Sequence, residues 1–592
     1  MTHRWAMAPD CSANGPPPDG AGLETLGFEP VVARFLRSRG FGAADAAEGF
    51  ARPRLTDLHS PTLLPDCDRA AERLLRALHG GEPIVVYADY DADGLCAGAI
   101  LYHVLSALAP RGARTGVTVY VPHRVDEGYG LHEEAIRALA TQGAKVVVSV
   151  DCGITAHGPA RVAKEIGIDL IITDHHNPTD ANDAPPDAYA VVHPRRNGTA
   201  YPFGELCGAG VAFKLAWRLV TMREGSDKVS EPMRALLLDL LALAAVGTVA
   251  DIVPLVGENR IIARYGLRRV KSTALAGLAT LVSASGLAGE EITSEHAGFA
   301  LAPRLNACGR LDSARDAVEL LTTAAGERAV EIAKRLTKLN DERRRTEAAI
   351  FEHAVRLAEE QGMTRDDRRA IVLAHADWHP GVVGIVCSRL VGKYHRPTIL
   401  LNEKDGACHG SGRSIDGFNL HGAISRCAPM LTKFGGHDMA AGLALEKDKL
   451  DEFVSAFTEH ANSVLTSEHL TPELRVDCDA SVDELTAEAV KQLSELGPFG
   501  RGNPQPRILL RGVTLARDAQ PFGAGGAHAS VFVKQGSREM RLVGWRWGER
   551  RRELLGGRPI DAVVEPKLNH WQGRVKVEPE LRDARLIDAG AM

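Results

Sequence analysis

The sequence predicts an α/β protein in which a doubly wound parallel sheet comes first, followed by long connecting helices, a second α/β domain and a C-terminal β domain. Short apolar segments alternate with helical ones over residues 84–193, a pattern typical of parallel sheets. Charged, helix-favouring sequence without proline fills 316–360, and short strands with Gly, Pro or Asn turns fill 467–592. Because 592 residues are too many for one core, we expect three or four domains of about 100–200 residues each.

Five short apolar segments predict the strands of the first sheet. They are residues 84–88, 117–121, 145–151, 169–174 and 188–193, most of them separated by a predicted helix. Continuous apolar runs are typical of strands that are covered on both faces. Ligands of such sheets bind at the carboxyl ends of the strands, and three of the five segments end in or just before an Asp.

The changes of pattern along the chain predict its domain boundaries. They are 1–60 for a disordered or poorly ordered N-terminal segment, 61–315 for the first α/β domain, 316–365 for the connecting helices, 366–466 for the second α/β domain and 467–592 for the C-terminal β domain. The N-terminal prediction comes from composition, because Pro, Gly, Ala and Asp dominate the start of the chain.

Composition indicates a soluble cytoplasmic protein. Hydrophobic residues make up 45% and charged residues 25% of the chain, as in ordinary globular proteins. No uninterrupted apolar run approaches the ~18–20 residues of a membrane span, and the N-terminus has no apolar signal segment. The ten Cys include no CxxC pair, so we expect neither a zinc finger nor structural disulfides.

The loop after the first strand carries three carboxylates at alternate positions, in the sequence ADYDADG. Asp89, Asp91 and Asp93 would repel one another unless a cation neutralised them. Hard divalent cations such as Mg²⁺ or Mn²⁺ take oxygen ligands of this kind. A solvated acidic turn is the alternative for this loop taken alone.

Three further groups of acidic or histidine residues follow or lie within apolar segments. Asp151 ends the VVVSVD segment, Asp174-His175-His176 ends LIITDHH, and Asp251 lies within the apolar sequence VGTVADIVPL. Each has a structural alternative: a helix cap, satisfied or surface histidines, and an internal salt bridge, respectively.

Taken together, these residues predict a two-metal site. The set comprises Asp91, Asp93, Asp151, His175 and Asp251. Its aspartates can bridge two ions ~3.5–4 Å apart, which activate water and stabilise the attacking and leaving oxygens of phosphoryl transfer. Carboxylates mixed with imidazole suit Mn²⁺ better than a set of oxygen ligands alone would.

The motifs DYDADG, VDCG, TDHH and VADIVP resemble the four phosphoesterase motifs of the DHH superfamily. Seven more narrow the resemblance to the bacterial RecJ family of single-stranded-DNA-specific exonucleases, from about Leu63 onward: VPHRVDEGYGL, ELCGAGVAFKL, FALAPRLNACGRL, WHPGVVGIVCSRL, GSGRSIDGFNL, KFGGHDMAAGL and LGPFGRGNPQP. The resemblance implies a DHH domain, a DHHA1-type second domain and a C-terminal OB-like β-barrel.

The resemblance also implies residue roles. Asp91, Asp93, Asp151, His175 and Asp251 would hold two Mn²⁺ or Mg²⁺ ions, with Asp151 between them. His176 would lie over the scissile phosphate, with Asp89 and Arg310 as further catalytic residues. The expected DNA and phosphate contacts are Arg124, Arg304, Asn306, Ser411, Arg413, Gly436 and His437, of which Ser411 and Arg413 resemble the family's pocket for the 5′ end. His193 departs from the Asn that many relatives carry, but it lies outside the metal motifs.

The net charge of −6 is unevenly distributed. Residues 501–592 hold 17 Lys and Arg against 10 Asp and Glu, a net charge of +7 that leaves −13 for residues 1–500. Aromatic residues stand among these basic ones: Phe522, Phe532, Trp545, Trp547 and Trp571. OB folds hold single strands with this combination, although each ring is equally compatible with a place in the core.

The resemblance implies a 5′→3′ exonuclease on single-stranded DNA that releases 5′-mononucleotides in DNA repair and recombination. It also implies a monomer that works with single-strand-binding protein and a helicase. Two alternatives stay open: a DHH phosphodiesterase for oligoribonucleotides or cyclic dinucleotides, and a non-catalytic DNA-binding scaffold. The basic C-terminal domain counts against the first, and the intact set of expected metal ligands counts against the second.

Overall fold

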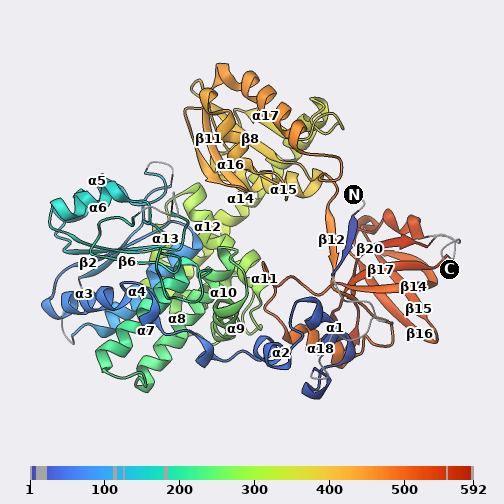
Figure 1. Ribbon diagram of the computed structural model, residues 1–592, viewed down its shortest axis with the longest axis horizontal. Helices are drawn as coiled ribbons and strands as arrows, with labels where there is room; N and C mark the ends of the chain where they lie inside the picture. Colours follow the sequence, from blue (N-terminus) through green and yellow to red (C-terminus); the bar gives the residue numbers. More distant parts are fainter. Residues whose placement is uncertain are drawn as a thin grey trace. The chain divides into compact units, whose positions relative to one another are not determined.

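The computed structural model describes residues 3–8, 23–110, 116–124, 127–178, 184–554 and 558–587 (Figure 1). The chain divides into two compact units. One comprises Met1–Arg4, Pro303–Ala317 and Glu327–Glu473, and the other Trp5–Ala302, Val318–Gly326 and Leu474–Met592. The second α/β domain therefore lies in one unit, and the first α/β domain and the C-terminal β domain lie in the other.

The first sheet is parallel and has five strands, as predicted. They are β2 (Ile84–Ala88), β3 (Val117–Tyr120), β4 (Val146–Val150), β5 (Asp169–Thr173) and β6 (Ala190–Val192), in the order β3-β2-β4-β5-β6. From β2 the chain adds β3 on one side of the sheet and then β4, β5 and β6 on the other side. The topological switch point therefore lies between β2 and β4. Ligand sites of doubly wound sheets lie at this point.

Helices cover both faces of this sheet. They are α3 (Cys67–Gly80), α4 (Ala92–Leu108), α5 (Glu133–Thr141), α6 (His157–Glu165) and α7 (Gly208–Glu224). Figure 1 shows α5 and α6 on one face and α3, α4 and α7 on the other. The α5–α6 face packs on apolar strand residues such as Val85 and Val147. Every residue of β2 and β4 is buried, which explains their continuous apolar sequence.

Further helices complete this unit before the connection to the second domain. They are α8 (Glu231–Ala250), α9 (Gly257–Val270), α10 (Ala276–Ala284) and α11 (Ser294–His296). Helix α11 runs through a π-helical turn at Ala297–Leu301 into α12 (Ala302–Leu311), which belongs to the other unit from Pro303 onward. Among the described residues, α8 alone is long and apolar enough to cross a membrane by length and composition. It packs against α4, α7 and α9, as the core helix of a globular domain does.

The other unit contains the predicted long helix and a mixed sheet. After α13 (Arg315–Thr322), α14 (Gly326–Glu360) continues for 35 residues. The strands are β7 (Ile371–His375), β8 (Thr398–Lys404), β9 (Ala407–Arg413), β10 (Lys433–His437) and β11 (Ala440–Glu446), in the order β10-β11-β9-β8-β7. Only the β7–β8 pair is parallel. Three helices pack against this sheet: α15 (Pro380–Tyr394), α16 (Leu420–Arg426) and α17 (Leu450–Val464).

The C-terminal strands form a closed barrel, as an OB-like domain requires. After β12 (Glu473–Val476), β13 (Cys478–Asp479) and α18 (Ala487–Glu495), the long strand β14 (Ile508–Phe522) pairs with both β15 (His528–Gln535) and β17 (Ile560–Glu565). The strands β16 (Arg538–Gly544) and β20 (Glu580–Leu586) close the ring. A separate hairpin, β18 (Leu568–Trp571) and β19 (Arg574–Val577), lies between β17 and β20 in the chain.

The prediction of a disordered or poorly ordered segment over residues 1–60 is wrong where the structure describes this segment. Strand β1 (Arg4–Met7) pairs with β12, and the helices α1 (Pro30–Ser38) and α2 (Ala44–Ala51) follow. Val32, Phe35 and Leu36 are fully buried and belong to the same apolar core as the barrel strands. Composition at the start of the chain hid this helix, because its apolar stripe is short; residues 9–22 lie outside the described part of the chain.

No disulfide joins the nine described cysteines, and all nine are buried.

Candidate metal centre and phosphate-binding residues

The predicted metal ligands meet at the switch point of the first sheet. Asp89, Asp91 and Asp93 follow β2, Asp151 follows β4, His175 follows β5, and Asp251 caps the C-terminal end of α8. Three groups of their ligand atoms lie within 4.8 Å of one another: Asp89, Asp91 and Asp151; Asp93, His175 and Asp251; and Asp151, His175 and His176. Asp151 and His175 belong to two groups each, so the groups form one continuous cluster.

Backbone N–H groups hold two of the carboxylates in place. Asp91 is the N-cap of α4, and its Oδ1 accepts hydrogen bonds from the N–H groups of Asp93 (2.9 Å) and Gly94 (3.1 Å). The Asp93 carboxylate accepts from Gly208 N (2.7 Å) and Ala209 N (3.0 Å) at the N-terminus of α7. The partial positive charge of that helix end offsets part of the negative charge. The alternating spacing of the loop thus serves helix capping as well as ligand placement.

Three buried polar atoms of the cluster have no hydrogen-bond partner: Asp89 Oδ1, Asp151 Oδ1 and His175 Nε2. His175 Nε2 lies 3.2 Å from Asp151 Oδ1 and 3.5 Å from Asp251 Oδ2. Leaving a buried polar group unpaired costs about 1–3 kcal/mol, and three such atoms converge on one place. Carboxylate oxygens and an imidazole nitrogen fit Mn²⁺ or Mg²⁺, so these residues match the metal that the sequence predicts.

Burial and mutual repulsion disfavour ionisation of these carboxyl groups. Burial, followed by the neighbouring carboxylates, raises the pKa of Asp93 to about 6 and that of Asp251 to about 8. The pKa values of Asp89 and Asp151 are raised well above their usual range for the same reasons. Burial and the His176 charge lower the pKa of His175 to about 3, so this imidazole is neutral, which is the form that binds a metal.

The second histidine of the DHH motif has a different environment. The Nδ1 atom of His176 hydrogen-bonds to Asp174 Oδ1 at 2.8 Å, and the Tyr129 hydroxyl lies 3.1 Å from Nδ1 and 3.3 Å from Nε2. Burial alone would lower the pKa of His176, but the Asp174 hydrogen bond and the charges of Asp174, Asp251 and Asp91 raise it to about 9. Asp174 also accepts from the N–H groups of Ile154 (2.8 Å) and His175 (2.7 Å). Asp174 therefore orients the two histidines, and it belongs to none of the candidate ligand groups.

Close packing around the cluster explains two motif glycines. A Cβ atom at Gly208 would lie 2.4 Å from Asp151 Oδ1, and one at Gly247 would lie 2.4 Å from Asp93 Oδ1. Asp151 itself has a φ of 63°, in the left-handed region, a conformation that is rare and costly outside glycine. The chain therefore accepts local strain to aim this carboxylate into the cluster.

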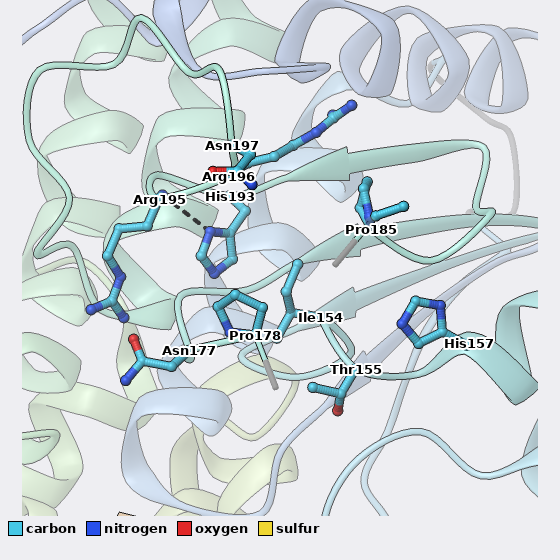
Figure 2. A pocket seen from close by; sticks show the side chains of 11 residues that line it. Ile154, Thr155, His157, Asn177, Pro178, Pro185, His193, Arg195, Arg196 and Asn197 are labelled. Carbon is cyan, nitrogen blue, oxygen red and sulfur yellow. Dashed lines mark hydrogen bonds between the residues drawn. The ribbon is translucent and has the colours of Figure 1, made fainter. Parts of the chain in front are cut away.

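A pocket of about 340 Å³ lies beside the DHH loop and is lined by none of the cluster carboxylates (Figure 2). His193 Nδ1 accepts from the Arg195 N–H at 3.1 Å, and its Nε2 lies 2.8 Å from the His176 carbonyl oxygen. The Arg195 guanidinium donates to the His175 carbonyl. His193 and Arg195 therefore hold the backbone of the DHH loop, and sequence reasoning missed both; only the unusual His193 signalled them.

Arg124 lies beside the carboxylate cluster. Its guanidinium lies 4.8 Å from the centre of the Tyr90 ring, in the loop between Asp89 and Asp91. Its positive charge also acts on Asp89, opposing the effect of burial on the pKa of that carboxyl. Of the predicted phosphate contacts, Arg124 is the one within the same unit as the candidate metal centre.

The other predicted phosphate contacts lie in the unit that contains the second α/β domain. Several of them lie around the start of α15. Arg310 Nη1 donates to the Gly381 carbonyl at 3.0 Å. A Cβ atom at Gly384 would lie 3.4 Å from both Arg413 Nη2 and Ser411 Oγ. Cations and a hydroxyl thus surround the N-terminal half of a 15-residue helix, where anions bind favourably.

The remaining predicted contacts are more dispersed within this unit. Gly436 and His437 lie on the exposed edge strand β10, and Ala440 pairs with His437 on one side and Arg413 on the other. Arg304 Nε donates to Thr337 Oγ1 at 3.2 Å. Arg304 and Asn306 both belong to α12.

The barrel separates its aromatic residues into core and surface. Trp547 is 3% exposed, whereas Trp545 and Trp571 are 48% and 70% exposed. Trp545, His528 and Phe522 pack together, and the Arg541 guanidinium lies 5.8 Å from the Phe522 ring. Arg541 also lines a pocket of about 360 Å³ with Trp571, Arg574 and Lys576 of the β18–β19 hairpin. We call Phe522, His528, Arg541, Trp545 and Trp571 the aromatic surface.

Family profiles match three parts of the chain: "DHH family, N-terminal domain" at 83–245, "DHHA1 domain" at 367–463 and "RecJ OB domain" at 476–583. The single-stranded-DNA-specific exonuclease RecJ of Bacillus subtilis is 39% identical, over 95% of this chain and 69% of that protein. RecJ of Escherichia coli is 36% identical, over 92% and 96% respectively.

Solved structures agree with the sequence relatives. The crystal structure of RecJ from Thermus thermophilus with Mn²⁺ matches with a TM-score of 0.79 and 30% identity, covering 96% of this chain and 77% of that one. The Mg²⁺ complex of the same protein matches with a TM-score of 0.74 and 28% identity, covering 96% and 76%. The chain therefore belongs to the RecJ family.

Proposed function

We propose that this protein is a metal-dependent exonuclease specific for single-stranded DNA, which hydrolyses phosphodiester bonds from the 5′ end and releases 5′-mononucleotides. The observation that carries the proposal is the convergence of three unpartnered buried polar atoms, on Asp89, Asp151 and His175, at the switch point of the sheet. Membership of the RecJ family supplies the substrate and the strand specificity. Polarity and product follow the family resemblance.

Two Mn²⁺ or Mg²⁺ ions would be held by Asp91, Asp93, Asp151, His175 and Asp251, of which Asp151 belongs to two of the candidate ligand groups. The placement of Asp89 Oδ1 among the unpartnered atoms adds Asp89 to the candidate ligands. When bound, such ions activate water and stabilise the attacking and leaving oxygens of an in-line displacement. The protein's own contribution is a rigid frame, since α4 and α7 fix Asp91 and Asp93 through backbone hydrogen bonds.

His176 is suited to stabilise charge on the reacting phosphate or to protonate the leaving oxygen. Asp174 fixes its ring through Nδ1, the Tyr129 hydroxyl lies 3.1 Å from Nδ1 and 3.3 Å from Nε2, and the side chain is partly exposed. A protonated imidazole at this place donates a charge-assisted hydrogen bond. Arg124, beside Asp89, is positioned to contact a phosphate of the same strand.

The 5′ end would be bound in the second α/β domain. Ser411, Arg413 and Arg310 stand around the N-terminal half of α15, and a terminal phosphate carries the charge that such a helix end stabilises. The aromatic surface of the barrel would hold the strand by stacking. This combination is what a nuclease that starts at an end and retains its strand requires.

Two other functions are less well supported. A phosphodiesterase for oligoribonucleotides or cyclic dinucleotides has no use for the basic barrel, and a non-catalytic scaffold has no use for the unpartnered carboxylates. We expect a cytoplasmic monomer that works with single-strand-binding protein and a helicase; these partners follow from family resemblance alone.

The proposal is tested with single strands labelled at either end and incubated with Mn²⁺. The expected result is mononucleotide release from a 5′-labelled strand at the earliest times, and progressive shortening of a 3′-labelled strand. Double-stranded DNA of the same sequence and a single-stranded oligoribonucleotide serve as matched substrates. Preferential cutting of the oligoribonucleotide, or binding without any cutting, would replace the proposal by one of the two alternatives.

A further inference from the structure

The LGPFGRGNPQP motif, residues 496–506, contains a tight turn that lies beside the segment 254–256, shortly after the ligand candidate Asp251. Gly500 and Asn503 close the turn, with Gly500 N donating to Asn503 O at 2.8 Å and Asn503 N donating to Gly500 O at 3.2 Å. Arg501 and Gly502 form its tip, and Gly502 has a φ of 75°. A glycine at this position is typical of a type II turn.

This turn packs directly on the residues that follow the metal-ligand candidate Asp251. The Leu255 N–H donates to the Arg501 carbonyl at 2.7 Å. A Cβ atom at Gly500 would lie 2.8 Å from Leu255 Cδ1, and one at Gly502 would lie 3.0 Å from Pro254 Cβ. The two glycines therefore allow the backbone at residue 501 to approach the segment 254–256 closely.

Further hydrogen bonds fix the segment that carries the turn. Arg264 Nη1 donates to the Glu495 carbonyl at 2.8 Å, and Ser294 Oγ donates to the Phe499 carbonyl at 2.7 Å. Asn503, which is 2% exposed, donates from its side chain to the carbonyls of Leu496 (3.1 Å) and Pro498 (3.0 Å). The position of the turn is thus specified from three sides.

The side chain at the tip of this well-fixed turn is an exposed arginine. Among the described residues, no hydrogen bond, ion pair or ring contact holds the Arg501 guanidinium. The Leu255 N–H that the Arg501 carbonyl binds lies only four residues after Asp251, so the backbone that carries this arginine packs against the segment that follows that carboxylate. Many interactions therefore fix the backbone of the turn, while the Arg501 guanidinium remains available to bind a ligand.

We propose that Arg501 is a phosphate-contacting residue of the catalytic centre, supplied by the segment between α18 and the barrel strand β14. It contacts a backbone phosphate of the single strand next to the metal ligands, and Arg264 is the positioning residue that holds its loop. A guanidinium suits this contact because it binds phosphate through two parallel hydrogen bonds whatever the base sequence. This inference rests on the proposed nuclease function, since it names a further residue for the same substrate.

The test measures binding of a single strand as a function of salt in the Asp151→Asn background, where cleavage is expected to be absent. Each phosphate neutralised on a single strand contributes about 0.7 to the slope of log affinity against log salt concentration. We expect Arg501→Gln to lower the slope by about 0.7 and to weaken binding on the order of tenfold. Arg501→Lys should restore the slope and only part of the affinity. An unchanged slope in Arg501→Gln would overturn the proposal.

Two controls separate contact from structure. Arg234→Gln removes an exposed arginine from the same unit; Arg234 is in α8, about 25 Å from Asp251 at 1.5 Å per residue, and should leave the slope unchanged. Arg264→Ala should lower the slope as Arg501→Gln does, with no further loss in the double variant. The melting temperature is measured for Arg501→Gln in the otherwise wild-type enzyme. A loss of its Mn²⁺-dependent rise there would indicate a structural role and overturn the proposal.

The failure of this inference and that of the proposed function are distinguishable. Wild-type enzyme that cuts no single strand, while Arg501→Gln still lowers the salt slope, would refute the nuclease and keep the phosphate contact. Wild-type enzyme that cuts, with kcat and KM unchanged in Arg501→Gln across salt concentrations, would keep the nuclease and refute the contact.

Discussion

The carboxylate cluster of the first sheet and the aromatic surface of the barrel are built in opposite ways. In the cluster, Asp151 and His175 are 2% and 7% exposed and carry polar atoms without partners. On the barrel, Trp545 and Trp571 are 48% and 70% exposed, and Trp571 lines a pocket together with Arg541. The difference teaches that, under the proposed function, catalysis would depend on concentrated, buried charge, whereas strand binding would depend on dispersed, exposed rings. Substitutions in the cluster should therefore abolish turnover, whereas substitutions on the barrel should weaken strand binding by degrees.

The largest effect is expected from Asp151→Asn. This carboxylate belongs to two of the three candidate ligand groups, so its loss should remove essentially all turnover on single-stranded DNA. The same change removes a buried like charge, so the metal-free variant should melt at a higher temperature than the metal-free wild type. Thermal unfolding with and without Mn²⁺ checks this, and a variant that keeps full activity would break the metal-site assignment.

A smaller effect is expected from His176→Asn. A general acid contributes about 10²–10⁴-fold to turnover, so kcat should fall within that range at saturating Mn²⁺. The Mn²⁺-dependent rise in melting temperature should persist, because the ligand role belongs to His175. Asp174→Asn, which leaves the ring in place but loosens its orientation, is the matched control and should lie between the wild type and His176→Asn. If the metal response disappears together with turnover, His176 is a ligand.

On the barrel, Trp571→Ala should act on binding alone. Stacking of one base on an aromatic ring is worth about 1–3 kcal/mol, so KM for a long single strand should rise about 5- to 150-fold. Turnover at saturating substrate should not change. Trp571→Phe keeps a ring and should retain most of the affinity. A fall in kcat without a change in KM would contradict the contrast between the two regions.

The stability of the metal-free protein should depend on pH because of the cluster. The pKa values of Asp93 and Asp251 are raised from the ordinary 3.8 to about 6 and about 8 by burial and neighbouring carboxylates. Between the ordinary and the raised value the folded state binds more protons than the unfolded state, so stability falls as pH rises. Melting temperature should therefore drop by several degrees from pH 5 to pH 8 without metal, and saturating Mn²⁺ should reduce this slope. A melting temperature that rises over the same range would contradict the assignment of both groups.

The sequence predicted the first sheet well, because each strand is a short, largely apolar run and three of the five runs end in or just before an Asp. It also predicted which residues converge, since the carboxyl ends of Ile84–Ala88, Val146–Val150 and Asp169–Thr173 meet at one edge. It could not predict how Asp174 and Tyr129 surround His176, because those hydrogen bonds depend on the tertiary packing of separate loops. Among the aromatic residues, sequence alone could not separate the buried Trp547 from the exposed Trp545 two positions away.

The N-terminal helix shows a second limit of sequence reasoning. Segments that pack with distant parts of the chain carry only a short local signal, and α1 spans just nine residues. Its partner residues lie more than 400 positions away: Arg34 pairs with Glu484, and Arg39 pairs with Asp477. Proline-rich sequence before such a helix resembles a disordered tail until the partner surface is known.

That packing has a consequence for how the protein is made. The ribosome synthesises Val32 and Phe35 early, but the barrel residues of the same apolar core, such as Val531 and Val564, are synthesised close to the end of the chain. The first sheet can fold while the chain is still growing, because its strands are close in sequence, whereas the barrel closes only after synthesis has passed its final strands. We therefore expect the candidate metal centre to form before the barrel can bind a strand. During this interval the apolar face of α1 would remain exposed to chaperones.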